Sequence, residues 1–300
     1  MERHCFETLI PGSVNGFQNS RTVFLPFSNS TVKGRGMCLA VIAYNTHPKY
    51  RLIIASNRDE FYSRASTPAH FWDDAPHILA GRDMQHKGTW FGITTRGKLA
   101  LITNVRDPGA MKSGSPSRGE IVKRYLRQDL SPDAYLEELL SRGKDFSGFN
   151  LIFGTVRKLF YYSNHPEHWQ EITPGIHALS NANLNTPWPK VEFAKEQLRK
   201  STENNHYIED SGLFPILFNS IEYPMQKLPD TGVGSSLEKM LSPVFIYSPN
   251  YGTRSSSVLK VDYNNQVTLS EKTFDRQEDG DTYQKRLENR ANSFSFRVDS

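Results

Sequence analysis

The sequence contains very little cysteine, and this scarcity excludes several classes of protein. Cys5 and Cys38 are the two cysteines among 300 residues. One pair of thiols is not a disulfide framework, and without a C-x-x-C spacing it cannot build a cysteine zinc or iron–sulfur site. We therefore expect free thiols in a reducing compartment, which favours a cytoplasmic location, and no metal site.

Long apolar runs and a strong excess of one charge are also missing. The longest apolar runs, such as Leu39–Tyr44 and Leu52–Ala55, have the length of strands, whereas a membrane span needs roughly 18 apolar residues. The net charge is only +4, and the basic residues are scattered among acidic ones rather than clustered to neutralise phosphates. We expect a soluble protein without a membrane span and without a nucleic-acid partner.

The composition changes near residue 36. Residues 1–36 are rich in serine, asparagine, phenylalanine and glycine and lack the continuous apolar segment of a secretory signal. An organelle transit peptide remains open, because this segment has few acidic residues. We favour a disordered leader or a misassigned start, with Met37 as the initiator, because the K-G-R-G before it can be encoded almost wholly in purines, as a ribosome-binding site is. Residues 37–278 then form a single domain, and residues 279–300 form a polar tail that we expect to fray.

Beyond Met37, strand patterns and helix patterns alternate in blocks. β-branched and aromatic runs predict strands at Cys38–Tyr44, Arg51–Ser56, Thr89–Thr95, Lys98–Asn104, 150–155, 158–163, 175–180, Thr253–Asp262 and Gln266–Phe274. Helices are predicted after the S-R-G-E capping box at Ser117, after Ser131-Pro132, after Thr186-Pro187, and near 212–223. This order is not strict βαβ alternation, and it predicts an α+β domain of antiparallel sheets with helices packed on them.

Cys38 is the first candidate for chemistry. If translation begins at Met37 and this methionine is removed, Cys38 carries a thiol and an α-amine on the same carbon. An α-amine titrates near 8 and a thiol near 8.5, so the amine can act as the base that activates the sulfur. The commoner role of a lone cysteine at the start of a strand is that of a small buried apolar residue.

The polar segment Asn57–Glu60 comes directly after the second predicted strand. Four polar side chains are costly to bury, so one interpretation is a solvated loop. In the other, Arg58 lies beside the sulfur and lowers the pKa of the thiol, while Asp59 accepts a hydrogen bond from the α-amine. Neighbouring antiparallel strands would place residues 38 and 57 at adjacent ends of one sheet.

Three later residues complete the set of candidates. Asn104 and Asn181 each end a predicted strand, where a side-chain amide can donate to an oxyanion, although asparagine is also common in turns. Arg254 opens the last predicted hairpin, where it would bind an anionic group or position a carboxylate, unless it simply lies on a polar edge strand.

Taken together, these segments resemble the NRDE family, the group of the transport and Golgi organisation protein 2. The resemblance extends from Met37 to about Phe274 and rests on M-C, N-R-D-E-F, G-x-W-x-G-I, T-N-V-R, L-S-N-A and G-T-R-S-S. The family is similar in plan to cysteine N-terminal-nucleophile hydrolases of the choloylglycine hydrolase and penicillin V acylase type. The resemblance implies a four-layer αββα sandwich and the catalytic residues Cys38, Arg58, Asp59, Asn181 and Arg254, with Asn104 as a second oxyanion candidate and Asn57 and Glu60 completing the motif.

Two features depart from the hydrolase pattern. A stretch of 36 residues precedes Cys38, so its amine is blocked unless the start of translation or processing exposes it. Arg58 and Asp59 are adjacent, whereas the corresponding hydrolase residues are separated by a few positions. Adjacent strand residues point to opposite faces of a sheet, which weakens the case that both reach one sulfur.

Three functions remain open at this level. The first is a hydrolase or acyltransferase that cleaves an amide or thioester bond of a small metabolite through Cys38 and requires no cofactor for catalysis. The second is a non-enzymatic protein that carries haem or another metabolite, because the NRDE family has been linked to haem trafficking and to Golgi organisation. The third is a structural protein with a vestigial site. The sequence does not indicate an oligomeric state.

Overall fold

Two antiparallel sheets lie face to face in the computed structural model, which describes residues 37–203, 205–276 and 287–298. The first sheet has the order β10-β1-β2-β11-β12-β13, with bounds Gly175–Leu179, Met37–Tyr44, Tyr50–Phe61, Tyr251–Asp262, Gln266–Arg276 and Leu287–Arg297. The second has the order β3-β4-β5-β6-β7-β8-β9, with bounds Ser66–Trp72, Ala75–Asp83, Phe91–Thr94, Lys98–Asn104, Phe149–Thr155, Lys158–Asn164 and Glu167–Glu171.

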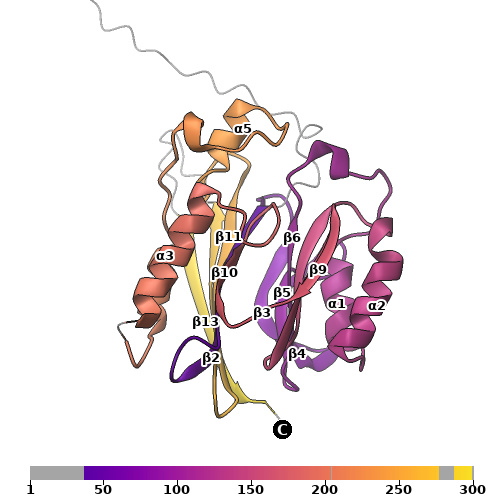
Figure 1. The fold of residues 1–300 in the computed structure, drawn as a ribbon, viewed down its shortest axis with the longest axis vertical. Helices are drawn as coiled ribbons and strands as arrows, with labels where there is room; N and C mark the ends of the chain where they lie inside the picture. The colour runs from indigo at the N-terminus through magenta and orange to yellow at the C-terminus, as the bar shows by residue number, and fades with distance from the viewer. Residues whose placement is uncertain (1–36, 204, 277–286, 299–300) are drawn as a thin grey trace, which may run out of the picture. The chain divides into compact units, whose positions relative to one another are not determined.

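Helices cover the outer face of each sheet (Figure 1). The second sheet carries α1 and α2, whereas the first carries α3 and α4, and α5 lies near one end of the first sheet. Their bounds are Gly119–Arg127, Pro132–Arg142, Pro189–Glu203, Asp210–Leu217 and Ser235–Met240. Short 3₁₀ turns occur at Pro108–Ala110, Gly143–Asp145 and Met225–Lys227. The layer order is therefore αββα, and the predicted α+β four-layer sandwich is confirmed.

Strand alternation divides the apolar residues among three cores. In β2, Ile54 faces the second sheet, and its neighbour Ala55 faces α3 and α4. The strands of the second sheet alternate in the same way, so that Ile152 lies between the sheets and Phe153 lies under α1 and α2. Because both faces of these strands are buried, β1, the first half of β2, β6 and β7 appear in the sequence as continuous apolar runs, and these runs made them predictable.

The two predicted caps have different outcomes. In α2, the Ser131 hydroxyl accepts from the Ala134 N–H and Pro132 occupies the first turn, as predicted. The capping box predicted for α1 is wrong, because α1 begins at Gly119 and its N-cap, Arg118, makes no side-chain capping bond. The chain is held at this point by a main-chain contact instead, since the Thr89 N–H donates to the Gly119 carbonyl at 3.2 Å.

The polar segment Asn57–Glu60 is not a solvated loop. It forms the last part of β2, and all four residues are buried between β1 and β11. The prediction that the strand ends before Asn57 is wrong, because neighbouring strands supply partners that make burial of these polar groups tolerable.

Other differences lie in the less regular parts of the chain. The sequence analysis missed β3, β4, β9 and α5. The helix expected near 212–223 is α4, which begins earlier and ends at Leu217. The prediction of a frayed tail beyond residue 278 is wrong for residues 287–297, because they form β13 and pair with β12. The leader and Cys5 lie outside the described residues. Within the described part of the chain, none of the helices combines the length and apolar character that crossing a membrane requires.

Candidate functional site

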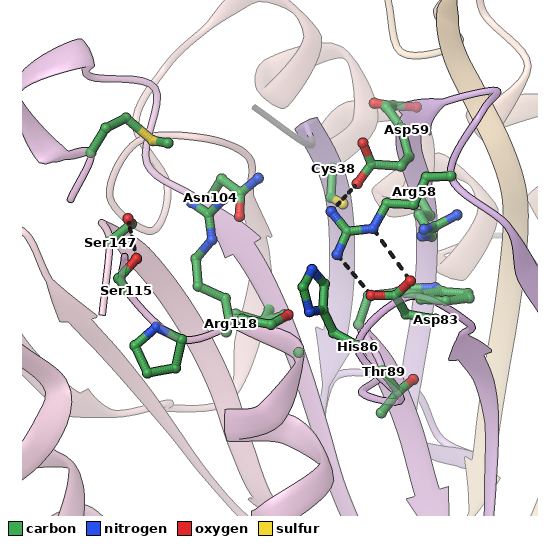
Figure 2. A pocket seen from close by; sticks show the side chains of 18 of the residues that line it. Cys38, Arg58, Asp59, Asp83, His86, Thr89, Asn104, Ser115, Arg118 and Ser147 are labelled. Atoms are coloured by element: carbon green, nitrogen blue, oxygen red, sulfur yellow. Dashed lines mark hydrogen bonds and ion pairs between the residues drawn. The ribbon is translucent and has the colours of Figure 1, made fainter. Parts of the chain in front are cut away.

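The polar ends of β1 and β2 border a cavity of about 240 Å³ between the two sheets (Figure 2). Its wall includes Cys38, Trp90 and Asn104, and most of the remaining lining residues are polar or charged. The charged residues come from both sheets and from the segment that leads into α1: Arg58, Asp59, Glu60, Arg64, Asp83, Lys112 and Arg118. A lining rich in polar and charged residues indicates a polar ligand rather than an apolar one.

Cys38 and Arg58 are direct cross-strand partners in the register of β1 and β2. Directly opposed residues point to the same face of a sheet, so the guanidinium lies beside the thiol. Arg58 is 5% exposed, its Nη1 donates to Ser66 Oγ at 3.2 Å, and its guanidinium lies 4.1 Å from the centre of the Trp90 ring. The structure thus places Arg58 beside the sulfur and fixes it there.

The Cys38 thiol is nevertheless neutral at pH 7 in the chain that contains Met37. Burial and the charge of Asp59 raise its pKa to about 12, and these effects outweigh the Asp59 main-chain N–H and the Arg58 charge, which act in the opposite direction. Arg58 therefore lowers the pKa of the Cys38 thiol, as predicted, but not enough to ionise it at pH 7. A thiol in this state is a weak nucleophile unless another base takes its proton.

Asp59 also borders the cavity, although strand alternation turns its side chain to the opposite face of β2 from that of Arg58. Its Oδ1 accepts from Thr253 Oγ1 at 2.6 Å. Its Oδ2 is buried and has no hydrogen-bond partner among the described residues. Because Asp59 is opposite Met37 in the register, this carboxylate lies where Met37 joins Cys38. Burial raises the pKa of Asp59 to about 7, against the effects of the Lys190 charge and the Thr253 bond.

Asn57 fastens layers together rather than lining the cavity. Its Nδ2 donates to the carbonyls of Leu217 at 2.8 Å and Val244 at 2.9 Å, and its Oδ1 accepts from Ser256 Oγ at 2.6 Å. These bonds join β2 to β11, to the end of α4 and to the segment before β11. Because the buried Asn57 side chain has all these partners, its contribution to stability alone explains the asparagine of the N-R-D-E motif.

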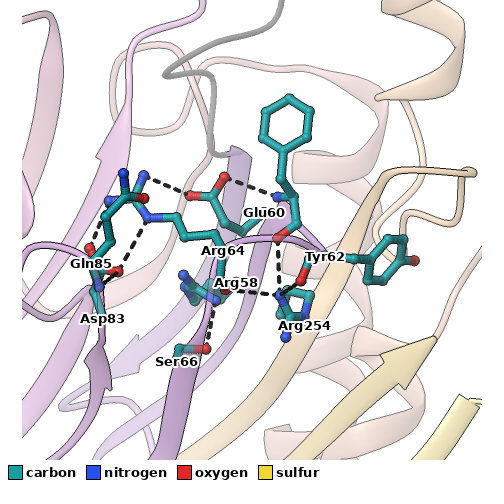
Figure 3. A network of polar contacts seen from close by, with 9 residues as sticks. Arg58, Glu60, Tyr62, Arg64, Ser66, Asp83, Gln85 and Arg254 are labelled. Atoms are coloured by element: carbon teal, nitrogen blue, oxygen red, sulfur yellow. Dashed lines mark hydrogen bonds and ion pairs between the residues drawn. The ribbon is translucent and has the colours of Figure 1, made fainter. Parts of the chain in front are cut away.

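Glu60, which lines the cavity, belongs to a network of polar contacts (Figure 3). Arg64, in the turn after β2, lies 3.5 Å from the Glu60 carboxylate and 2.7 Å from the Asp83 carboxylate. Burial raises the pKa of Asp83, but the bonds with Arg64 outweigh it and hold this pKa below its ordinary value. The sequence analysis missed Arg64 and Asp83, because only the turn between β2 and β3 brings them to Glu60.

Arg254 is not among the residues that line the cavity. It lies at a register shift between β11 and β2, where a bulge redirects the side chain. Its Nη1 donates to the carbonyls of Phe61, Tyr62 and Arg64 at 3.0 to 3.2 Å (Figure 3). Arg254 therefore holds the turn that positions Arg64, and the structure does not bring it to Cys38.

The two asparagine candidates also separate. Asn104 lines the cavity, whereas Asn181 does not, and the Asn181 amide donates to the Asn104 carbonyl at 2.9 Å. The neighbouring Ser180 hydroxyl donates to the Cys38 carbonyl at 3.2 Å. Asn181 and Ser180 thus position the strand ends that carry Asn104 and Cys38, and Asn104 is the better placed of the two candidates.

Arg118 reaches the cavity because two glycines bring α1 close to the second sheet. A side chain on Gly88 would place its Cβ 2.6 Å from the main-chain carbon of Gly119, so this close approach requires glycine. Burial lowers the pKa of Arg118 to about 10, and its Nη1 donates to the Gly148 carbonyl at 3.0 Å. The G-x-W-x-G-I segment therefore contributes both this close approach and the Trp90 ring.

Three more charged side chains are buried on the helix side of the first sheet. Lys190 is 2% exposed, and its Nζ donates to the Leu241 carbonyl at 3.0 Å. Arg106 and Glu238 form an ion pair at 2.6 Å, with side chains that are each 2% exposed. The sequence analysis missed this cluster, although Lys190 shows one signal: it lies four residues before the buried Ala194, on the apolar face of α3.

The described residues contain no group of three histidine, cysteine, aspartate or glutamate side chains able to hold a metal ion.

Comparison with known proteins places this geometry in context. Residues 37–276 match the model of the family described as Transport and Golgi organisation 2. A Homo sapiens relative, the transport and Golgi organization protein 2 homolog, is 36% identical over 257 residues, which cover 79% of this chain and 93% of the relative.

Two solved structures are remotely similar. The Caenorhabditis elegans ortholog of N-acylethanolamine-hydrolyzing acid amidase is 12% identical, with a TM-score of 0.40, and the match covers 74% of this chain and 92% of that chain. The conjugated bile acid hydrolase from Clostridium perfringens is 7% identical, with a TM-score of 0.41, and the match covers 88% of this chain and 97% of that chain.

Proposed function

We propose that this chain, which belongs to the Transport and Golgi organisation 2 family, is an acyl-transfer enzyme that cleaves an amide or thioester bond of a small anionic metabolite through Cys38. One observation carries the proposal: Cys38 borders a cavity opposite a fixed Arg58, while a buried Asp59 oxygen that has no hydrogen-bond partner in the described part of the chain lies where Met37 joins Cys38. An unsatisfied buried carboxylate oxygen is costly. A free α-amine on Cys38 would satisfy it.

The reaction follows from a Cys38 whose α-amine is free. The amine takes the thiol proton, and the sulfur attacks the substrate carbonyl carbon to form a tetrahedral adduct. The ammonium then protonates the leaving amine or thiol as its bond to that carbon breaks, which leaves a thioester on Cys38. Water, or an acceptor nucleophile, attacks this thioester and releases the acyl group, while the amine again accepts and returns the proton.

Individual residues have separate parts in this reaction. Arg58 favours the thiolate by its charge, and Asp59 orients the α-amine through its unpartnered oxygen. Asn104, which lines the cavity, is the proposed donor to the oxyanion of the adduct. Asn181 holds the Asn104 main chain and is a positioning residue.

The cations of the cavity define the class of substrate. Arg64 forms ion pairs with Glu60 and Asp83, and Arg118 and Lys112 add two further cations on the wall that the second sheet and the approach to α1 provide. A carboxylate or phosphate on the substrate would complement these two cations and would leave the scissile carbonyl toward Cys38. This assigns to Arg118 the anion-binding part that the sequence analysis gave to Arg254.

Intact-mass measurement and N-terminal sequencing of the protein from its native host test the proposal first. A mature chain that begins at Cys38 is expected, followed by a burst of p-nitrophenolate from p-nitrophenyl acetate and an acetyl adduct on Cys38. Cys38→Ala should abolish the burst, and Cys38→Ser should reduce it strongly, with the unfolding midpoint unchanged in both. A mature chain that retains Met37, or a burst that survives in Cys38→Ala, would exclude this chemistry and favour the haem or metabolite carrier.

A further inference from the structure

The turn after β10 is fastened to the second sheet through its main chain. Carbonyl groups of three consecutive residues accept hydrogen bonds from β6, from the segment after it and from β7: Ser180 from Thr103 Oγ1 at 2.5 Å, Asn181 from the Arg106 N–H at 2.8 Å, and Ala182 from Asn150 Nδ2 at 3.1 Å. The turn contains the L-S-N-A segment, and two of its donors belong to the T-N-V-R segment. Two segments that are far apart in the sequence thus form one structural unit.

The side chains of the same turn are directed toward the candidate site. The Ser180 hydroxyl donates to the Cys38 carbonyl at 3.2 Å, and the Asn181 amide donates to the Asn104 carbonyl at 2.9 Å. The turn therefore connects the second sheet, which holds its main chain, with the proposed nucleophile and the proposed oxyanion donor. A shift of the turn would move both groups relative to the cavity.

Thr103 and Asn150 are the two donors that act through their side chains, and both lie deep between the sheets. They are cross-strand partners in the register of β6 and β7, and they are 1% and 0% exposed. Asn150 interrupts an otherwise apolar stretch of β7, and its Oδ1 accepts from Tyr161 Oη at 2.8 Å. Burial of such polar groups is costly unless they are hydrogen-bonded, and the donors of both side chains are directed at the turn after β10.

We infer that Thr103 and Asn150 are positioning residues for the proposed reaction: they hold the turn after β10, and this turn holds the nucleophile and the oxyanion donor in place. The catalytic part of the inference rests on the proposed function, whereas the positional part does not. Neither residue is among those that line the cavity, so neither contacts the substrate. Their effect is on the rate of acylation, because a displacement of about 1 Å in a reacting group can slow a reaction by as much as 10²-fold.

The first experiment compares Thr103→Val with Thr94→Val. Valine has the shape of threonine but lacks the hydroxyl, so Thr103→Val removes the donor to the Ser180 carbonyl. Thr94 is equally buried and lies in the same β5–β6 hairpin, but its hydroxyl accepts from the Lys98 N–H at the opposite end of the hairpin. The two variants should therefore lose similar amounts of thermal stability. Thr103→Ser keeps the hydroxyl and is the conservative variant.

Amide hydrogen exchange at Arg106, followed by NMR, reports whether the turn is held, because this N–H donates to the Asn181 carbonyl. The exchange should be about tenfold faster in Thr103→Val, since loss of one bond of the turn makes its local opening easier. In Thr94→Val and Thr103→Ser the Arg106 amide should exchange as in the parent protein.

Acylation of the mature chain by p-nitrophenyl acetate supplies the catalytic readout. The rate constant of the burst should fall about tenfold in Thr103→Val, with the half-saturating substrate concentration unchanged, and should stay at the parent value in Thr94→Val and Thr103→Ser. An Arg106 amide that exchanges at the parent rate in Thr103→Val overturns the inference, as does a loss of acylation that Thr94→Val shares. If the parent protein shows no acylation, the proposed function fails, and the exchange measurement alone decides whether Thr103 holds the turn.

Asn150→Leu is an independent variant that keeps the test valid if Thr103→Val folds poorly. It removes the donor to the Ala182 carbonyl, whereas Tyr161→Phe keeps this donor and removes the hydroxyl bonded to Asn150. Exchange at Arg106 and acylation should change in Asn150→Leu and stay near the parent values in Tyr161→Phe. If the two variants give the same result, the bond to the turn has no separate effect, and the inference is overturned.

Discussion

The two interfaces between a sheet and its helices differ in one respect. Under α1 and α2 the contacts are made by interlocking rings, with the Tyr125 ring 4.8 Å from Tyr135 and 5.4 Å from Phe153 between centroids. The interface on the first sheet is equally apolar along most of α3 but ends in buried charges at the end near Cys38. Buried charges seldom stabilise a fold better than apolar packing does. The difference therefore identifies the interface under α1 and α2 as structural and places the buried charges of the other interface next to the candidate site.

The largest expected effect breaks the apolar interface. Phe153→Ala should lower the free energy of unfolding by about 3–5 kcal/mol, because it removes a fully buried ring from the centre of that core. Denaturant unfolding measures the change, and the loss should be the same at every pH where the protein is folded. Trp169→Ala, on the exposed strand β9, is the matched control and should leave the midpoint unchanged. A loss of stability that occurs only below pH 7, or only above it, would contradict this interpretation.

A somewhat smaller effect is expected from breaking a charge pair in the other interface. Glu238→Gln keeps the shape of the side chain but leaves Arg106 buried without its counter-charge, and Arg106 Nε and Nη2 already lack partners among the described residues. We expect a loss of about 3 kcal/mol that added salt does not remove. Asp74→Asn, which breaks the exposed contacts with Arg82 and Arg127, is the control and should leave the unfolding midpoint almost unchanged.

The third effect is a pH dependence that the charged interface should show and the apolar interface should not. The pKa of Asp59 is about 7 in the folded protein, against roughly 4 for an unfolded aspartate. Between these values the folded state retains a proton that the unfolded state has lost. The free energy of unfolding should therefore fall, by about 3 kcal/mol, as pH rises from 4 to 7.

Asp59→Asn should remove this slope. Urea unfolding of the parent and the variant at several pH values gives the difference between them, from which the contribution of other buried carboxyls such as Glu271 cancels. Parallel curves for the two proteins would show that Asp59 does not titrate in this window.

The sequence predicted those parts of the fold that depend on local composition. Strand β1 and the β5–β6 hairpin were identifiable because short apolar runs rich in β-branched and aromatic residues favour strands. The predicted Arg96-Gly97 turn is also present, and Gly97 has the positive φ that favours glycine. The end of β2 was not identifiable, because polar residues favour a loop unless distant partners are known. Thr253 and Ser256, which accommodate Asp59 and Asn57, come from β11.

The residues of the candidate site also divide into those that the sequence could predict and those that it could not. Cys38, Arg58 and Asp59 could be proposed because their spacing in one strand pair can be read from the sequence, and the register places them together. Arg254 could not be placed correctly, because a bulge that no sequence pattern announces turns it to the β2–β3 turn. Arg118 and Lys190 were missed, because each enters the site through the packing of a helix and not through a motif.

The position of β2 in its sheet also affects how the protein is made. This strand lies between β1, which precedes it directly, and β11, which begins at Tyr251. A ribosome that adds 5–20 residues per second needs roughly 10–40 s to travel from the end of β2 to the start of β11. During that interval the N-R-D-E segment of the nascent chain has one edge without a strand. Any shortened transcript that ends before residue 251 would therefore encode Cys38 and its motif, yet leave them in a strand that cannot be completed.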